Sequence, residues 1–167
     1  MTEQEIRTIL NRQREYFATG ATLSREFRAK QLGKLKASLQ RHETELNDAL
    51  QQDLGKSRME SYMCEIGLTL SELTWMQKHL RGLMQEKRVP TPLSQFAAIS
   101  FRSPSPYGTV LIMSPWNYPV LLTLDPLIDA IAAGNTAVVK PSAYAPATAA
   151  VLKMILEECF QAKYVTV

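Results

Sequence analysis

The chain has 167 residues, a net charge of +3 and 46% hydrophobic residues. This length suffices for one domain with its own core, and so small a charge does not favour nucleic acid as a partner. No apolar run is long enough to predict a membrane-spanning segment, and the charged first 20 residues lack the apolar core of a signal peptide. With two cysteines that form no motif, the composition predicts a reduced, cytoplasmic setting.

Proline and charge divide the chain into two parts. All nine prolines lie between Pro90 and Pro146. Residues 1–91 hold 15 Lys/Arg and 12 Asp/Glu, whereas residues 92–167 hold 4 of each. The excess positive charge therefore belongs to the first part.

The first part has the periodicity of helices. Ser24 is placed to cap a helix, and Gly55 is expected to separate that helix from a second one. Ser57 with Glu60 has the capping-box pattern at the start of the second helix. The first helical stripe is Phe27, Leu32, Leu35, Leu39, Leu46 and Leu50; the second is Met59, Met63, Ile66, Leu70, Leu73 and Leu80. We expect both stripes to pack against a sheet formed by the second part.

Two proline pairs, Pro90/Pro92 and Pro104/Pro106, bracket a segment rich in apolar residues. Proline at both ends of a segment favours extended backbone. We therefore predict one strand over residues 96–101.

Strands and helices then alternate, which predicts a parallel sheet. Pro126 fits the first turn of its helix, so that helix is expected to start near Thr123, and Gly134 suits the position just after it. The expected elements are strand 109–113, a helix near 121–133, strand 136–140, a helix near 146–160 and a strand over 164–167. The fold class is α/β, with a helical layer added to the first half of a doubly wound sheet.

Polar residues follow the first two strands of this sheet. Ser114-Pro-Trp-Asn-Tyr-Pro119 comes after the first strand, and the second strand ends at Lys140-Pro-Ser142. In open α/β sheets, ligands bind at the carboxyl ends of strands. Asn117 and Lys140 are therefore expected where a cofactor and a substrate would meet.

These motifs resemble the aldehyde dehydrogenase superfamily, and its class 3 (fatty and aromatic aldehyde) branch most closely. The resemblance covers roughly residues 25–167 and includes three more stretches: Asp53-Leu-Gly-Lys-Ser57, Glu65-Ile-Gly67 and Arg88-Val-Pro-Thr-Pro92. Members of that family are much longer, and their nucleophilic cysteine and general-base glutamate lie beyond position 167. The resemblance thus implies an amino-terminal fragment. It would be an incomplete NAD(P)-binding domain made of a helical region (1–88), a bridging and oligomerisation strand (89–106) and a βαβαβ half (107–167).

The resemblance implies oxidation of an aldehyde to a carboxylic acid with NAD or NADP as cofactor, in a homo-oligomer. It gives Asn117 the role of donor to the developing oxyanion, and Ser114, Trp116, Lys140 and Ser142 the role of cofactor binding. Spacing alone favours a different reading, with Asn117 as a turn residue bonded to its own backbone and Lys140 as a solvated lysine. Trp116 could also be a core residue.

Ala143 departs from the family pattern. Many members have a glutamate directly after Lys-Pro-Ser, and that carboxylate binds the ribose hydroxyls and repels a 2′-phosphate. With alanine at position 143, we expect weaker discrimination against NADP.

The cysteines and histidines are predicted to serve packing rather than catalysis or metal binding. Cys64 and Cys159 lie in helical patterns without a positioned base, and two distant histidines and cysteines cannot form a metal site. The isolated chain is therefore expected to be inactive. The alternative function is a non-catalytic fragment that binds a nucleotide or another subunit.

Overall fold

The structure is a computed structural model that describes residues 2–167. Its α-helices are α1 (Glu3–Ala18), α2 (Arg25–Arg41), α3 (Glu43–Leu54), α4 (Arg58–Ser61), α5 (Gly67–Leu83), α6 (Leu121–Ala133) and α7 (Pro146–Cys159). A π-helical turn, η1 (Tyr62–Ile66), joins α4 to α5, and η2 (Leu93–Gln95) is a short 3-10 helix. The strands are β1 (Lys87–Val89), β2 (Ser100–Arg102), β3 (Thr109–Met113), β4 (Thr136–Lys140) and β5 (Val165–Thr166). In the described part of the chain, no helix is both long and apolar enough to cross a membrane.

The three strands β3, β4 and β5 form a parallel sheet in that order. Helix α6 connects β3 to β4, and α7 connects β4 to β5. This confirms the predicted α/β fold and the bounds of the first two strands. It also leaves β3 at one edge of the sheet.

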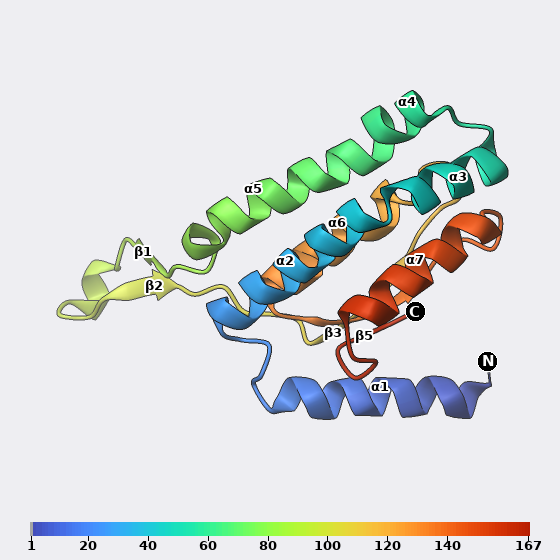
Figure 1. The fold of residues 1–167 in the computed structure, drawn as a ribbon. Coiled ribbons are helices and arrows are strands. Elements are labelled where there is room, and N and C mark those ends of the chain that lie inside the picture. The colour runs from blue at the N-terminus through green and yellow to red at the C-terminus, as the bar shows by residue number, and fades with distance from the viewer. Residues whose placement is uncertain (1) are drawn as a thin grey trace.

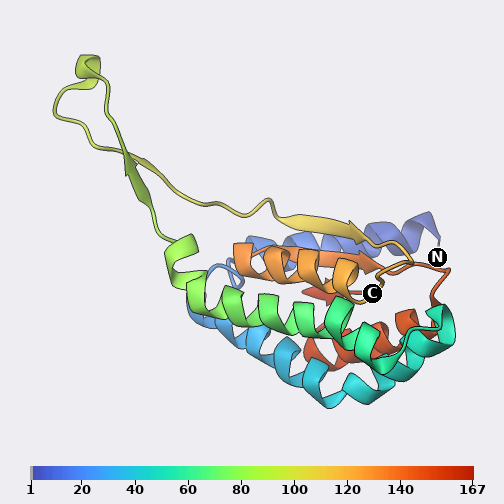
Figure 2. The same cartoon turned by 90° about the horizontal axis from the view of Figure 1, so that it is seen from above.

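The helices form layers on both faces of this sheet (Figures 1 and 2). Helix α1 contacts β3 and β4 on one face, and α6 contacts the same strands on the other. Helices α2, α3 and α5 form a further layer, which packs on α6 and α7. The expectation that the stripes of the first part face the sheet is therefore wrong. Leu124, Leu127, Ile128 and Ile131 make α6 apolar on several sides, and all four are buried, so α6 separates the outer helices from the strands.

Helix α1 was not predicted as a separate helix, although its residues fall within the helical region 1–88 that the resemblance implied. It begins with a capping box, in which the Glu5 N–H donates to Thr2 Oγ1 at 3.3 Å and the Thr2 N–H donates to the Glu5 carboxylate at 2.6 Å. Its sheet-facing residue Gln13 is fully buried and donates to the Ala137 carbonyl at 2.7 Å. Gln13 therefore interrupts the apolar stripe formed by Ile6, Ile9, Leu10 and Phe17 on the same helix.

The predicted caps at Ser24 and Gly55 are present, but the capping box at Ser57 is half formed, since Ser57 accepts a hydrogen bond from the Glu60 N–H and the described residues show no return bond from the Glu60 side chain. The helical register also differs from the prediction. Ser24 accepts a hydrogen bond from the Phe27 N–H, and Gly55 ends α3 in the left-handed conformation with φ 68°. The chain also breaks at His42, between α2 and α3. Met59 and Met63, predicted to be on the buried stripe, are 71% and 61% exposed. The π turn holds extra residues relative to an α-helical turn, so the stripe predicted from α-helical spacing does not continue through it.

Helix α6 has the predicted bounds 121–133, but the start near Thr123 that was inferred from Pro126 is wrong. It starts at Leu121, and Pro126 lies in its second turn rather than its first. The carboxylate of Glu65 accepts hydrogen bonds from the N–H groups of Val120 and Leu121 and so supplies partners for the start of the helix. Pro126 removes one intrahelical hydrogen bond, and its exposed position leaves the freed carbonyl near solvent. Gly134 ends the helix with φ 92°, as predicted.

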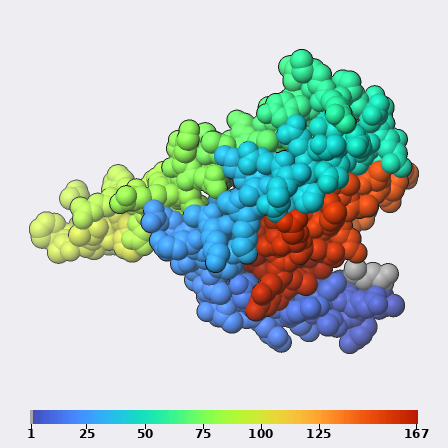
Figure 3. Space-filling view, viewed as in Figure 1, coloured from blue at the N-terminus to red at the C-terminus, as the bar shows by residue number. Residues whose placement is uncertain are grey.

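The segment between α5 and β3 is an antiparallel hairpin that extends away from the body (Figures 2 and 3). β1 pairs with β2, with Lys87 opposite Arg102. The predicted strand 96–101 is wrong for most of its length, because residues 96 and 97 form a turn in which Ala97 has φ 77°, and β2 begins only at Ser100. A single proline-bounded strand was expected, and the structure instead has two short strands joined by η2.

Candidate active site

The carboxyl ends of β3 and β4 lie side by side. Met113 pairs with Lys140, and the Ser114 N–H donates to the Lys140 carbonyl at 3.3 Å. The loop that contains Pro-Trp-Asn and the loop that contains Lys-Pro-Ser therefore begin at neighbouring positions. The structure thus brings together the two motifs that the sequence placed at the edge of the sheet.

Asn117 lies in the loop between β3 and α6, and its side chain is exposed. Within residues 2–167 its side-chain amide makes no hydrogen bond, whereas its backbone carbonyl accepts one from Lys56 Nζ at 3.0 Å. A turn asparagine would use its side chain to bond the nearby backbone. The exposed amide of Asn117 is instead free to donate to a ligand.

Trp116 and Lys140 are also exposed at this edge. Trp116 is 53% exposed, so it is not a packed core residue in this chain. Lys140 is also exposed, at the last position of β4. A cation and an aromatic ring at adjacent strand ends suit the phosphates, hydroxyls and ring faces of a dinucleotide.

The two predicted serines are bound within the protein. The Ser114 hydroxyl accepts a hydrogen bond from Thr123 Oγ1 at 2.6 Å, and the Ser142 hydroxyl accepts one from the Tyr144 N–H at 3.2 Å. Ser142 is only 6% exposed. In this structure both hydroxyls therefore shape the loops next to Trp116 and Lys140.

A buried ion pair lies directly beneath the Asn117 loop. Lys56 Nζ is 2.6 Å from Glu65 Oε1, and these side chains are 9% and 0% exposed. Both residues belong to motifs of the family resemblance, Asp53-Leu-Gly-Lys-Ser57 and Glu65-Ile-Gly67, to which the sequence assigned no role. The available sequence signal was the proximity of a charged residue to a glycine: Lys56 directly follows Gly55, and Glu65 lies two residues before Gly67.

Neither cysteine is placed as a nucleophile. Burial raises the pKa of the Cys159 thiol, which disfavours the thiolate, and its Sγ lies 3.7 Å from the Lys34 carbonyl. Cys64 is half-buried in the π turn. Nucleophilic cysteines need an exposed, electropositive position beside a base, so both cysteines serve packing in this segment.

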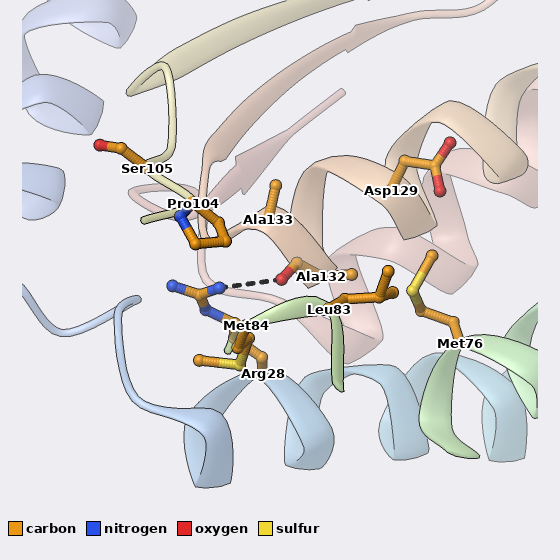
Figure 4. A pocket seen from close by; sticks show the side chains of 9 residues that line it. All are labelled: Arg28, Met76, Leu83, Met84, Pro104, Ser105, Asp129, Ala132 and Ala133. Atoms are coloured by element: carbon orange, nitrogen blue, oxygen red, sulfur yellow. Dashed lines mark hydrogen bonds between the residues drawn. The ribbon is translucent and has the colours of Figure 1, made fainter. Parts of the chain in front are cut away.

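A separate hollow of about 190 Å³ lies at the other end of α6, where it ends at Gly134 (Figure 4). Its wall includes the buried guanidinium of Arg28, which donates to the carbonyls of Ala132 and Thr22, each at 3.0 Å. A cation bonded to the last carbonyls of a helix stabilises that terminus. Arg28 therefore has a structural role, and this hollow does not adjoin Asn117.

A parallel sheet with helices on both faces defines the class of doubly wound α/β folds. Residues 1–165 match the aldehyde dehydrogenase family. The chain is 44% identical over 152 residues to 4,4'-diaponeurosporen-aldehyde dehydrogenase of Staphylococcus aureus, covering 91% of this chain and 33% of that protein. It is 47% identical over 133 residues to human aldehyde dehydrogenase family 3 member B1, covering 80% of this chain and 28% of that protein.

The fold agrees with these sequence matches. The structure superposes on the substrate-bound state of Staphylococcus aureus AldH with a TM-score of 0.95 and 42% identity, over 97% of this chain and 35% of that chain. The chain belongs to the aldehyde dehydrogenase family, which confirms the predicted class 3-like resemblance. It spans about a third of the length of the curated relatives that it matches.

Proposed function

We propose that the chain is the amino-terminal part of an NAD(P)-dependent aldehyde dehydrogenase that oxidises aldehydes to carboxylic acids. The observation that carries this proposal is the adjacency of the two strand ends, where Met113 pairs with Lys140 and the exposed Asn117 follows. The names of the Staphylococcus and human relatives support the same chemistry. Below, the full-length protein that carries these residues is called the complete enzyme.

In the proposed mechanism, Asn117 acts on the aldehyde oxygen. When a thiolate attacks the carbonyl carbon, negative charge develops on that oxygen, and an amide N–H aimed at it lowers the barrier. The exposed side chain of Asn117 can supply this donor. The attacking thiolate and its base lie outside these residues in the proposal, because Cys159 is buried and the carboxylate next to Cys64, that of Glu65, is paired with Lys56 and Val120.

Lys140 and Trp116 are proposed to bind the cofactor, which accepts hydride from the substrate when bound. Lys140 would pair with a ribose hydroxyl or a phosphate, and the exposed face of Trp116 would line the site. Ser114 and Ser142 would support the two loops through their hydrogen bonds to Thr123 and Tyr144. Ala143 provides no carboxylate against a 2′-phosphate, so the proposal includes both NAD and NADP.

A second candidate function is subunit interaction by a non-catalytic fragment. It is favoured by the hairpin β1–β2, whose apolar side chains Leu93, Phe96 and Ile99 are 93%, 90% and 66% exposed. Exposed apolar clusters of this kind favour contact with another chain. Together with the family resemblance, this exposed surface supports a homo-oligomer as the assembly. The cytoplasmic location stays a prediction from composition.

The test of the proposed function is acylation in the complete enzyme with Asn117→Ala. Losing a true oxyanion donor costs about 2.7–4 kcal/mol, or about 10²–10³ in rate. Stopped-flow kinetics should show this loss while the affinity for the cofactor stays unchanged. An unchanged acylation rate would overturn the assigned role of Asn117. The isolated 167-residue chain, assayed for reduction of NAD or NADP with several aldehydes, should show no turnover above background.

A further inference from the structure

The carboxylate of Glu65 makes all of its contacts inside the protein. Oε1 faces Lys56 Nζ at 2.6 Å, and Oε2 accepts hydrogen bonds from the N–H groups of Val120 at 2.7 Å and Leu121 at 3.3 Å. Glu65 is fully buried. A buried carboxylate is tolerated only when its charge and its oxygen atoms are paired in this way.

Lys56 contacts the same loop from its other end. Its ammonium group donates to the Asn117 carbonyl at 3.0 Å and lies 4.1 Å from the centroid of the Tyr118 ring. The ion pair therefore contacts the loop on both sides of Pro119. Lys56 contacts Asn117 and Tyr118 before the proline, and Glu65 contacts Val120 and Leu121 after it. Since two of these contacts are to backbone N–H groups and one is to a carbonyl, they restrain the path of the main chain.

Two glycines allow the ion pair to form. Gly55 ends α3 in the left-handed conformation, directly before Lys56. Gly67 closes the π turn that carries Glu65, and its N–H donates to the Tyr62 carbonyl. A Cβ at position 67 would lie 2.7 Å from that carbonyl oxygen, which is closer than real contacts allow. π turns inside helices occur frequently at functional sites.

We infer that Lys56 and Glu65 are positioning residues, which hold the backbone of residues 117–121 so that the Asn117 amide points to the aldehyde oxygen. This inference rests on the proposed function of Asn117. Catalytic donors lose much of their effect when displaced by about 1 Å. Other hydrogen bonds restrain this loop at Ser114, through the Lys140 carbonyl and Thr123, and at the carbonyls of Tyr118 and Pro119, through the Leu122 N–H and Thr123 Oγ1. The hydrogen bond from Lys56 acts on the backbone of Asn117 itself.

Asp53 offers a matched control. Its carboxylate accepts hydrogen bonds from the N–H groups of Ala147 at 3.1 Å and Thr148 at 2.7 Å. Asp53 therefore caps the start of α7 as Glu65 caps the start of α6. In the described residues, Asp53 has no hydrogen bond to residues 117–121. A variant at Asp53 separates the general effect of losing a helix-capping carboxylate from an effect on Asn117.

The first experiment measures amide hydrogen exchange in the 167-residue chain. The variants are Glu65→Leu and the double variant Lys56→Met/Glu65→Leu, which replaces both charges and so avoids an unpaired buried lysine. Val120 and Leu121 should lose about tenfold or more of their protection, the equivalent of one charge-assisted hydrogen bond. The Ile131 amide in the same helix should keep its protection, and so should Val120 in Asp53→Leu. Unchanged protection of Val120 and Leu121 in both Glu65 variants would overturn the inference.

The second experiment measures acylation in the complete enzyme. The double variant should lower kcat by about 10- to 100-fold, as expected for a displaced donor, with little change in KM for the cofactor. Asp53→Leu should leave the acylation rate unchanged. Adding Asn117→Ala to the double variant should slow acylation little further, because both changes remove the same interaction.

The outcomes distinguish this inference from the proposed function. If Asn117→Ala alone acylates at the wild-type rate, the proposed role of Asn117 fails, and the positioning role fails with it. If Asn117→Ala is slow but the Lys56/Glu65 variant acylates normally, only the positioning role is overturned. Fully additive losses would also overturn it, since they would show that the ion pair acts independently of Asn117.

Discussion

Asp53 and Thr148 are joined by a hydrogen bond of 2.7 Å between a side-chain carboxylate and a backbone N–H at the start of α7. The Ala147 N–H donates to the same carboxylate at 3.1 Å. Helix α7 has no side-chain cap from its own preceding residue, Ala145. A residue from the end of α3 therefore supplies the cap, and the negative charge also suits the positive end of the helix.

We expect Asp53→Ala to destabilise the chain by about 0.5–2 kcal/mol, the usual cost of losing an N-terminal cap. Urea unfolding followed by circular dichroism measures this difference. The control is Asp48→Ala, since Asp48 is exposed and pairs with the exposed Arg58 at 3.3 Å. Equal stability of the two variants would show that the cap contributes little.

Ala143 makes a prediction about cofactor choice. The complete enzyme should use NADP nearly as well as NAD, because position 143 has no carboxylate to repel a 2′-phosphate and the exposed Lys140 is nearby in the sequence. Comparing kcat/KM for the two cofactors tests this. Ala143→Glu should shift the ratio towards NAD. A wild-type enzyme that already excludes NADP by orders of magnitude would show that another residue makes the choice.

His42 predicts a pH dependence of stability. It lies between α2 and α3, and its Nε2 is 2.9 Å from the Glu158 carboxylate on α7. The hydrogen bond to Glu158 raises the pKa of His42 above its ordinary value of 6.5, and the hydrogen bond to Glu45 adds a smaller effect in the same direction. A raised folded-state pKa means that the stabilisation is fully present below pH 6.5 and is lost as the pH rises through the folded-state pKa.

Glu158, the partner of His42, limits the stabilisation at low pH. Hydrogen bonds to His42 and Arg41 lower the pKa of Glu158 below 4.5, so its contribution is lost as the pH falls through that lowered value. Because Glu158 is 43% exposed, solvent screens the pair and we expect its contribution to the free energy of unfolding to be small. The measurement is the free energy of unfolding of wild type and His42→Gln from pH 5 to 9. A difference between them that does not shrink as the pH rises would contradict the prediction.

The isolated chain should self-associate. β3 is an edge strand of the sheet, and its Leu111 and Met113 are 62% and 69% exposed. The hairpin adds a second apolar surface, with Leu93 and Phe96 at its tip. Unpaired strand edges and exposed apolar patches recruit further chains.

Sedimentation at several concentrations tests this association. Leu111→Lys should weaken it if the edge of β3 is the contact, and Leu93→Ser/Phe96→Ser should weaken it if the hairpin is. A charged residue in an edge strand opposes pairing, whereas the hairpin change removes only apolar surface. A single monomeric species up to high micromolar concentration would show that neither surface recruits a partner.

The sequence by itself determined the features that depend on neighbouring residues. The bounds of β3 and β4, the cap at Ser24 and the glycine ends of α3 and α6 all follow local patterns, and all are present. The adjacency of the Asn117 and Lys140 loops also followed from the sequence, because consecutive strands joined by a helix form neighbours in a parallel sheet.

Only the tertiary structure decided the features that join distant residues. The π turn exposes Met63 and buries Glu65, and Glu65 in turn sets the start of α6, 55 residues away from it at Val120. The same contact explains why Pro126 lies in the second turn of α6. Periodicity could not show this, since it describes which face of a helix is apolar but not which buried charge will meet which backbone group.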